Sequence, residues 1–289
     1  MKILILGGSG MLGHRLWTLL QKNHETWVTI RGHASEFPDS PDFPRNFIRT
    51  DVDALNFDQI TRALASIQPD IVINCIGLIK QMGHLARDPL FSISLNAMLP
   101  HRISMICRVA KIRMIHISTD CVFSGKKGNY TEEDQSDAED LYGRTKFLGE
   151  VSYPHCVTLR TSIIGRELKN KLGLIEWFLA QEGVINGFRK AIYSGFTTDE
   201  IANIIENYIL PNPSLSGMYH VSSDPINKFN LLTLTQKTFK RDDILIQPED
   251  NFVIDRSLNS DRFRKLTGYT PPTWEKMISD LGNLPTYYD

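Results

Sequence analysis

Short apolar runs alternate with longer amphipathic stretches through the first half of the chain. Six runs have the length and the β-branched content of buried strands, namely 3–6, 26–30, 46–49, 70–74, 113–118 and 156–160. Between several of these runs, apolar residues recur three or four positions apart, as in Leu12, Leu16 and Leu19. Alternating strands and helices form right-handed crossovers and a parallel sheet that is covered on both faces. The pattern therefore predicts a Rossmann-type, doubly wound α/β domain over residues 1–160.

The pattern loosens in the second half of the chain. Helices are predicted at 172–181, 198–209, 231–239, 258–266 and 274–281, and one short strand at 218–223. We interpret residues 161–289 as mainly a smaller C-terminal α/β lobe that binds substrate, with some segments returning to the first domain. Ligands of open α/β folds bind at the carboxyl ends of the strands, which such a lobe would cover.

Composition narrows the class of protein. The chain has 289 residues, a formal net charge of −1, and 42% hydrophobic residues, which favours a soluble globular protein over a partner of nucleic acid or membrane. Its N-terminal apolar run is too short for a signal peptide or a membrane span, and its four cysteines show no CxxC spacing. Its histidines lack the spacing of metal ligands. We expect a cytoplasmic protein with reduced thiols and no metal.

The sequence GGSGMLG follows the first predicted strand and opens a helix. Gly7 would permit the tight turn, Gly10 would let backbone N–H groups approach a pyrophosphate, and Gly13 would let the helix sit close to the strand. A dinucleotide is therefore expected on this loop. The loop residues expected to hold it are Gly7, Ser9, Gly10, Met11 and Leu12.

The end of the second predicted strand indicates which dinucleotide binds. An acidic residue there would bind the ribose 2′-hydroxyl of NAD, but the chain has Arg31, whose guanidinium matches a 2′-phosphate. We therefore expect NADP(H) as the preferred cofactor, with NAD(H) as the alternative. Asp51 and Val52 after the third strand, and Ile76 and Gly77 after the fourth, are placed to line the same cofactor.

Tyr142 and Lys146 lie four positions apart in DLYGRTKFLGE, so a helix would place both on one face. An ordinary surface pair is one interpretation. However, the combination of this segment with GGSGMLG, STDCVFSG, YTEED, LRTS and FRKLTGYTPPTWEKMI resembles the extended short-chain dehydrogenase/reductases over nearly the whole chain. Within them it is most similar to the dTDP-4-dehydrorhamnose reductase family and its nucleotide-sugar relatives.

This resemblance implies that Tyr142, Lys146 and Thr119 are catalytic. Tyr142 would give a proton to a carbonyl oxygen, Lys146 would lower the pKa of the phenol and bind the nicotinamide ribose, and Thr119 would hold the substrate oxygen. The implied enzyme is an NADP-preferring reductase of a nucleotide-linked 4-keto-6-deoxysugar that serves surface polysaccharide synthesis.

Residues beside Thr119 distinguish related activities. Sugar 4,6-dehydratases carry Asp-Glu after this threonine, whereas this chain has Asp120 and Cys121 and so lacks the glutamate that dehydration needs. GDP-fucose synthases have a cysteine equivalent to Cys121 and a second acid–base residue near Glu167. Both residues are therefore candidates for substrate contact and for epimerisation alongside reduction. The alternative interpretation of Cys121 is a thiol that merely fills space beside the substrate.

Further expectations concern the substrate, the class of protein and its assembly. Rhamnose reductases have tryptophan where this chain has Ile163, so rhamnose itself is not established as the product. Arg189 and Lys190 are candidates for binding the substrate diphosphate, and ordinary surface positions are the alternative for both. Some relatives are not enzymes, among them the regulatory β subunit of methionine adenosyltransferase, so a non-catalytic NADP-binding subunit is the alternative from another class. Homodimers are common among relatives.

Overall fold

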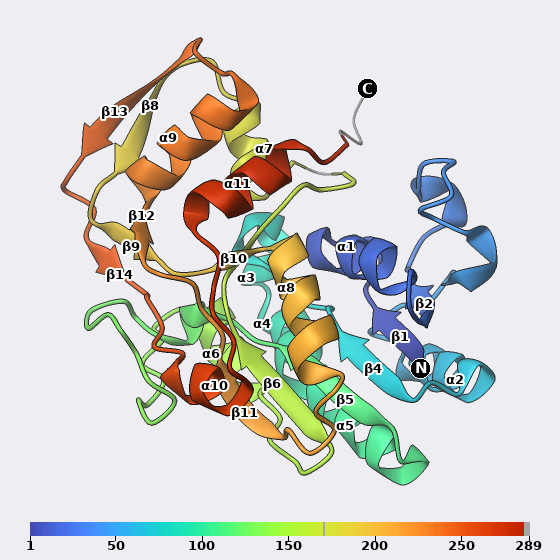
Figure 1. Cartoon of the computed structure of the whole chain (residues 1–289). Coiled ribbons are helices and arrows are strands. Elements are labelled where there is room, and N and C mark those ends of the chain that lie inside the picture. Colours follow the sequence, from blue (N-terminus) through green and yellow to red (C-terminus); the bar gives the residue numbers. More distant parts are fainter. Residues whose placement is uncertain (170, 286–289) are drawn as a thin grey trace. The chain divides into compact units, whose positions relative to one another are not determined.

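The computed structural model describes residues 1–169 and 171–285, and the chain divides into two units (Figure 1). Each unit is built from three separate segments. Unit 1 consists of Met1–Ser118, Glu139–Leu159 and Ala202–Met218. Unit 2 consists of Thr119–Ala138, Arg160–Ile201 and the chain from Tyr219 onward. The chain thus passes from one unit to the other five times.

A seven-stranded sheet organises unit 1. Its strands are β1 (Lys2–Leu6), β2 (Glu25–Thr29), β3 (Ile48–Arg49), β4 (Ile71–Asn74), β5 (Arg113–Ile117), β6 (Cys156–Arg160) and β11 (Gly217–His220). Their order is β11–β6–β5–β4–β1–β2–β3, and each pair from β3 across to β6 is parallel. Strand β1 pairs with β2 on one side and with β4 on the other, so the strand order reverses at β1. Doubly wound sheets bind their ligands at the carboxyl ends of the strands, at this point of reversal. The predicted Rossmann-type fold is confirmed.

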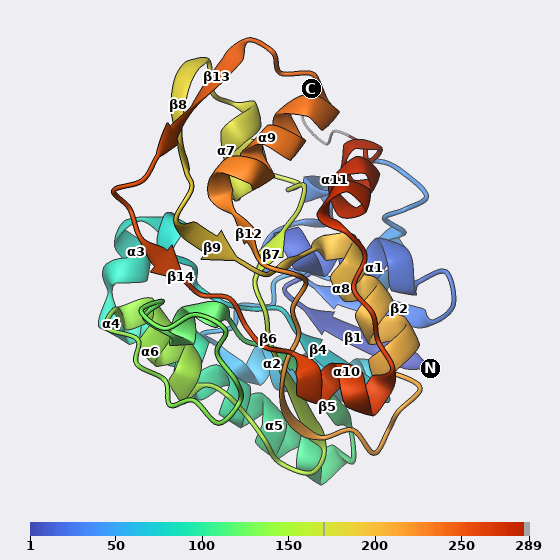
Figure 2. The same ribbon diagram turned by 60° about the vertical axis from the view of Figure 1, so that its left-hand side comes forward.

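Helices flank this sheet and supply the other half of its core (Figures 1 and 2). They are α1 (Met11–Leu20), α2 (Phe57–Ile67), α3 (His84–Arg87), α4 (Pro89–Ser92), the π-helix η4 (Ile93–Met98), α5 (Leu99–Ala110), α6 (Leu141–Leu148), α8 (Thr198–Ile204), which begins in unit 2, and the π-helix η6 (Ile205–Ile209). Ile60 and Leu64 of α2 pack with Ile103 of α5 against Leu4 and Met114 of the sheet. These buried residues recur at the helical and strand spacings of the sequence.

The edge of the sheet beyond β2 differs from the prediction in detail. The third strand is shorter than 46–49, because residues 45–47 form a 3₁₀ turn, η2 (Arg45–Phe47). The Pro-rich segment 36–44 is anchored by two buried aromatic side chains. Phe37 and Phe43 pack on Trp17 of α1, with ring centroids 5.2 and 5.6 Å from the indole. Two further 3₁₀ turns are η1 (Ala34–Glu36) and η3 (Lys80–Met82).

Unit 2 combines three small sheets with four helices among the described residues. Its elements are η5 (Asp120–Val122), β7 (Ile163–Ile164), α7 (Leu174–Leu179), β8 (Gly183–Phe188), β9 (Ala191–Tyr193), β10 (Phe196–Thr197), β12 (Ile226–Asn227), α9 (Lys228–Phe239), β13 (Ile244–Glu249), β14 (Ile254–Asp255), α10 (Asp261–Thr267) and α11 (Trp274–Gly282). The sheets have the orders β10–β7, β12–β9–β14 and β13–β8. The predicted helices are all present, whereas the strands from β7 to β10 and β12 to β14 were missed, since they are short and follow no sustained alternation.

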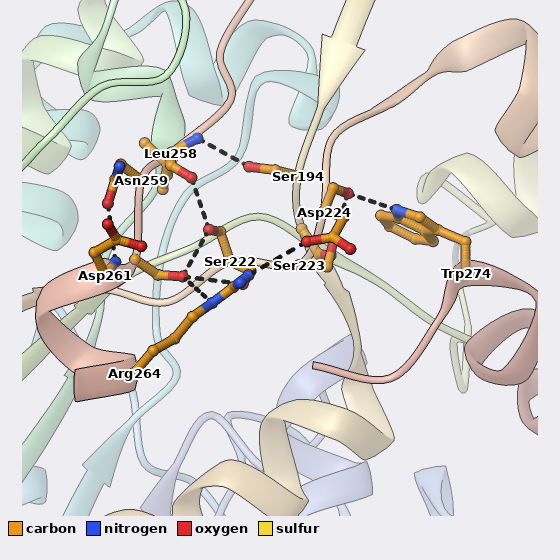
Figure 3. Close-up of polar contacts among 11 residues, drawn as sticks. Ser194, Ser222, Ser223, Asp224, Leu258, Asn259, Asp261, Arg264 and Trp274 are labelled. Atoms are coloured by element: carbon orange, nitrogen blue, oxygen red, sulfur yellow. Dashed lines mark hydrogen bonds and ion pairs between the residues drawn. The ribbon is translucent and has the colours of Figure 1, made fainter. Parts of the chain in front are cut away.

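A polar network holds the segment that follows β11 (Figure 3). The Ser222 hydroxyl donates to the Leu258 carbonyl at 2.7 Å, and Arg264 Nη2 donates to the Ser222 carbonyl at 2.9 Å. Trp274 Nε1 donates to the Asp224 carbonyl at 2.7 Å. These bonds tie residues 222–224 to α10 and α11, and so fix the chain that leads through β12 into α9.

Two kinds of feature are absent from the described residues. None of their helices is long and apolar enough to cross a bilayer. They also contain no group of three or more His, Cys, Asp or Glu side chains that could hold a metal ion.

Candidate functional site

The loop between β1 and α1 leaves backbone N–H groups open at the start of a helix. Gly7 has φ +87°, and Gly10 N donates to Gly7 O at 3.1 Å. A Cβ on Gly13 would lie 2.2 Å from Gly7 O, so this approach of α1 to β1 requires glycine. Gly10 caps α1 without a side-chain bond, and the first turn holds no acidic residue. The N–H groups of Met11 and Leu12 thus lie at the N-terminus of α1, the positive end of its dipole, where a phosphate is stabilised. The predicted loop residues are together here: Gly7, Ser9, Gly10, Met11 and Leu12.

The other predicted cofactor residues follow the carboxyl ends of β2, β3 and β4. Arg31 is exposed and forms no ion pair with any described residue. Asp51 is exposed and has φ +57°, and Val52 N donates to the carbonyl of residue 30 at 3.0 Å. Ile76 is partly buried, and Gly77 beside it is exposed. Because neighbouring parallel strands end at one edge, these residues share the edge with the glycine loop.

Helix α6 carries Tyr142 and Lys146 one turn apart. Asp140 caps this helix by accepting a hydrogen bond from Gly143 N at 2.9 Å. Lys80 lies 2.7 Å from the Asp140 carboxylate and 5.6 Å from the centroid of the Tyr142 ring. The N-terminal turn that holds Tyr142 is therefore fixed by a side-chain cap and by a cation from η3.

Lys146 is a buried residue and does not lie on the surface. Its Nζ donates to the Ile117 carbonyl, at the end of β5, over 2.7 Å. Burial lowers the pKa of Lys146 to about 8, while Glu150 and Cys75 act against this shift. A Cβ added to Gly77 would lie 3.9 Å from Nζ. The ammonium thus stands at the carboxyl edge of the sheet, between the ends of β4 and β5.

Asn96 is a member of this site that the sequence did not indicate. It is buried within the π-helix η4, where its side chain accepts from Leu78 N at 2.8 Å and donates to Leu78 O at 3.0 Å. Its amide also lies 3.4 Å from the Thr145 hydroxyl of α6. The side chain therefore joins the loop after β4 to the helix that carries Tyr142 and Lys146. A π-helix, which often marks a functional site, has no simple signature in one sequence.

Thr119 is the first residue of unit 2, two positions beyond β5. Its hydroxyl donates to Asp120 Oδ1 and accepts from Cys121 N, both at 3.1 Å. Burial raises the pKa of Asp120, and the cations Arg256 and Lys228 act against this shift. Arg256 Nη1 lies 3.6 Å from the Cys121 sulfur. The segment therefore presents a hydroxyl, a carboxyl and a thiol in a row, beside two cations.

The small sheet β12–β9–β14 supplies these cations. Tyr193 ends β9, Lys228 directly follows β12, and Arg256 directly follows β14. Lys228 Nζ lies 4.1 Å from the centroid of the Tyr193 ring. Arg256 Nε donates to the Phe123 carbonyl at 2.8 Å. Sequence reasoning missed both cations, because this pairing of three short strands is not visible in the sequence.

Glu167 and Arg189 have partners away from the segment 119–121. The Glu167 carboxylate accepts from Gly173 N at 2.9 Å, and burial raises its pKa. Arg189 is exposed and makes a two-pronged ion pair with Asp250, with Nε 2.9 Å from Oδ1. Neither side chain hydrogen-bonds to residues 119–121. The structure thus brings Asp120 and Cys121 together with Thr119, but does not join Glu167 or Arg189 to them.

Comparisons with known proteins show the family and the fold of the chain. The model of the family described as RmlD substrate binding domain matches residues 1–281. A probable low-salt glycan biosynthesis reductase, Agl14 of Haloferax volcanii, is 25% identical over 76% of this chain and 73% of that protein. The structure of a hypothetical dTDP-4-dehydrorhamnose reductase from Sulfolobus tokodaii is 25% identical and has a TM-score of 0.74, covering 95% of this chain and 98% of that one. That of dTDP-4-dehydrorhamnose reductase from Bacillus anthracis, in complex with NADP, is 20% identical and has a TM-score of 0.78, with 97% and 98% covered.

Proposed function

Since the chain belongs to the family of the RmlD substrate binding domain, we propose that it is a reductase of a nucleotide-linked 4-keto-6-deoxysugar. The protein is an NAD(P)-dependent oxidoreductase of the extended short-chain dehydrogenase/reductase type. The observation that carries the proposed reaction is the buried Lys146 one helical turn from Tyr142, with its Nζ on the Ile117 carbonyl at the end of β5. The glycine loop follows β1 at the same carboxyl edge of the sheet.

Tyr142 acts as the proton donor in the proposed reaction. A bound reduced cofactor would supply the hydride, and the Tyr142 phenol would give its proton to the carbonyl oxygen, so that the ketone becomes an alcohol. Lys146 is largely protonated at neutral pH, since its pKa is lowered only to about 8. Its ammonium stabilises the phenolate that remains and binds the ribose hydroxyls of the cofactor.

Thr119 holds the carbonyl oxygen of the substrate. In the structure its single hydroxyl proton is directed to Asp120 Oδ1, and its oxygen accepts from Cys121 N. To bind a ketone, the hydroxyl rotates its proton from Asp120 to the substrate oxygen. The neighbouring Arg256 guanidinium compensates the carboxylate when it loses that bond.

NADP is the preferred cofactor in this proposal. The support is Arg31, which is exposed after β2 and has no ion-pair partner among the described residues, so its guanidinium is open to a 2′-phosphate. Turnover measured with NADPH and with NADH at equal concentrations tests the preference. A higher kcat/KM with NADH would overturn it.

The deciding experiment follows NADPH absorbance against a panel of enzymatically prepared nucleotide-linked 4-ketosugars. We expect consumption with at least one 4-keto-6-deoxysugar, and a loss of about 10²- to 10⁴-fold for Tyr142→Phe at unchanged NADPH affinity. A Tyr142→Phe protein that binds NADPH and turns over at the wild-type rate would remove the assignment. Cofactor binding without turnover by the wild type across the panel would favour the alternative of a regulatory subunit.

Epimerisation alongside reduction is a second candidate, favoured by the position of Cys121. The Arg256 guanidinium 3.6 Å from its sulfur favours a thiolate, which can take a proton from a carbon beside the ketone. Turnover in deuterated water tests this activity. If no deuterium appears at the ring carbons next to the new alcohol, epimerisation is excluded and Cys121 is a residue that fills space.

Three broader proposals complete this function. The protein lies in the cytoplasm. Its product serves surface polysaccharide synthesis, as the family resemblance suggests. The protein is a homodimer through η4 and α5, where Met98 of η4 and Met105 and Val109 of α5 are 52, 59 and 81% exposed on one face. Sedimentation equilibrium measures the mass in solution, and the mass of a single chain at micromolar concentration would refute the dimer.

A further inference from the structure

Lys228 occupies a position that helix physics disfavours. It is the first residue of α9, next to the cap Asn227, where the helix dipole is positive and a cation is destabilising. Its side chain is partly buried, and burial lowers the pKa of Lys228 to about 8. A residue that breaks a local rule in this way is a candidate for function.

The contacts of the Lys228 ammonium leave its hydrogen-bonding capacity unused. Nζ lies over the Tyr193 ring at 4.1 Å, and the acidic groups that interact with it are Asp120 and Cys121. Among the described residues the ammonium has no hydrogen-bond acceptor and no ion pair within 4 Å. It therefore retains three N–H donors beside the segment that carries Thr119.

The cation next to it is differently placed. Arg256 donates from Nε to the Phe123 carbonyl and approaches the Cys121 sulfur through Nη1. Its guanidinium is thereby tied to the segment 119–123 itself. Of the two cations beside Asp120, Lys228 is the one whose donors are all unused.

We propose that Lys228 is a specificity-determining residue that, together with Asp120, binds a hydroxyl group on the carbon next to the substrate ketone. This inference rests on the proposed function, in which Thr119 holds the ketone oxygen. A hydroxyl can accept from an ammonium and donate to a carboxylate at once. An anionic substituent would be attracted by Lys228 but repelled by Asp120. In a 4-keto-6-deoxyhexose the hydroxyl that meets this condition is the one on carbon 3.

The test compares two nucleotide-linked 4-keto-6-deoxyhexoses that differ in the presence of the 3-hydroxyl group. For the wild type we expect kcat/KM to be at least about 100-fold higher with the hydroxyl, because the deoxy analogue leaves two charged groups without their partner. Lys228→Met keeps the length of the side chain and removes the donors. It should lower kcat/KM for the hydroxy substrate about 10- to 100-fold and leave the deoxy substrate within about twofold.

Matched variants separate this role from a structural one. Lys237→Met changes an exposed lysine of the same helix and should leave the preference unchanged. Lys228→Arg retains a cationic donor and should retain most of the preference. Equal losses of kcat/KM on both substrates in Lys228→Met would show a structural role, and unchanged kcat/KM on both substrates would show no role. Either result overturns the proposal.

A binding measurement distinguishes failure of this inference from failure of the proposed function. Calorimetric titration with the two corresponding alcohols, each linked to its nucleotide, reports recognition without turnover. If the wild type consumes no NADPH but binds the 3-hydroxy compound more tightly in a way that Lys228→Met abolishes, reduction is refuted and the recognition site stands. If reduction proceeds without such discrimination, the recognition site is refuted alone.

Discussion

Lys146 in unit 1 and Lys228 in unit 2 have the same pKa for the same main reason, yet they stand in opposite structural settings. Burial lowers each pKa to about 8. Lys146 lies in the second turn of α6 and gives a hydrogen bond to the Ile117 carbonyl. Lys228 starts α9 and has a ring and two acidic groups around it, but no hydrogen-bond acceptor among the described residues.

This difference separates a held cation, whose ammonium donates to the protein as in Lys146, from an open cation, whose N–H donors are unused as in Lys228. The position of Lys146 is fixed by the protein itself, which suits the proposed role beside Tyr142. Lys228 is oriented by an aromatic face, which attracts an ammonium without using its N–H groups. Equal pKa values therefore do not imply equal roles, and hydrogen-bond partners distinguish the two.

The largest expected effect is that of Lys146→Met. Removing the held cation takes away the stabilisation of phenolate and a ligand of the cofactor, so kcat should fall about 10²- to 10⁴-fold with every substrate. Steady-state kinetics on the 3-hydroxy and 3-deoxy substrates measures it. A loss confined to the hydroxy substrate would break the comparison, since it would give Lys146 the role proposed for Lys228.

A second prediction concerns the glycine loop of unit 1, the unit that also holds Lys146. Gly13→Ala places a Cβ 2.2 Å from Gly7 O, so α1 must move away from β1, at a cost of about 1–3 kcal/mol in the free energy of unfolding and with loss of NADPH affinity. In Gly10→Ala the Cβ would lie 3.4 Å from Gly7 O, and stability should stay nearly unchanged. Denaturant unfolding and cofactor titration measure both variants. Equal stability of the two proteins would contradict the close approach.

The smallest expected effect compares the stability of Lys228→Met and Lys146→Met. Each lysine has an ordinary pKa of 10.5 when unfolded and about 8 when folded, so the unfolded chain binds more protons between these values and stability rises with pH across them. The cost of burying the charge is fully present below about pH 8. At pH 7 we expect Lys228→Met to raise Tm by about 2–4 °C.

Lys146→Met should gain less, because it leaves the Ile117 carbonyl without its donor. The gain of Lys228→Met should shrink as pH rises from about 8 to 10.5, where wild-type Lys228 loses its charge. Thermal scans at pH 7 and 10 compare the two variants. A larger gain for Lys146→Met at pH 7 would contradict the assignment of held and open cations.

Unit 1 was predictable from sequence because its signals are local. Gly7, Gly10 and Gly13 sit in one turn, and Tyr142 and Lys146 lie within one helix, so spacing alone brings each set together. Six of the seven strands of its sheet lie in the apolar runs of the first 160 residues, and strands covered on both faces require such runs. The observed strands differ from the predicted ones only at their ends. For example, Arg45–Phe47 form a 3₁₀ turn where a strand was predicted.

The neighbours of Asp120 could not be predicted in the same way. Lys228 and Arg256 reach it because β12 and β14 pair with opposite edges of β9, and those strands have two or three residues each. Pairing over such long sequence distances leaves no periodic trace. Asn96 was missed for another reason, since its role depends on a π-helical turn inside an otherwise ordinary helical stretch.

The five passages of the chain between the units have a consequence for how such a protein can be altered. Because each unit is assembled from three separate segments, no single cut yields either one whole. Exchanging unit 2 for that of a relative would require several grafts made together, with Thr119–Ala138 among them. New substrate ranges are thus reached more readily through individual side chains than through recombination of contiguous gene fragments.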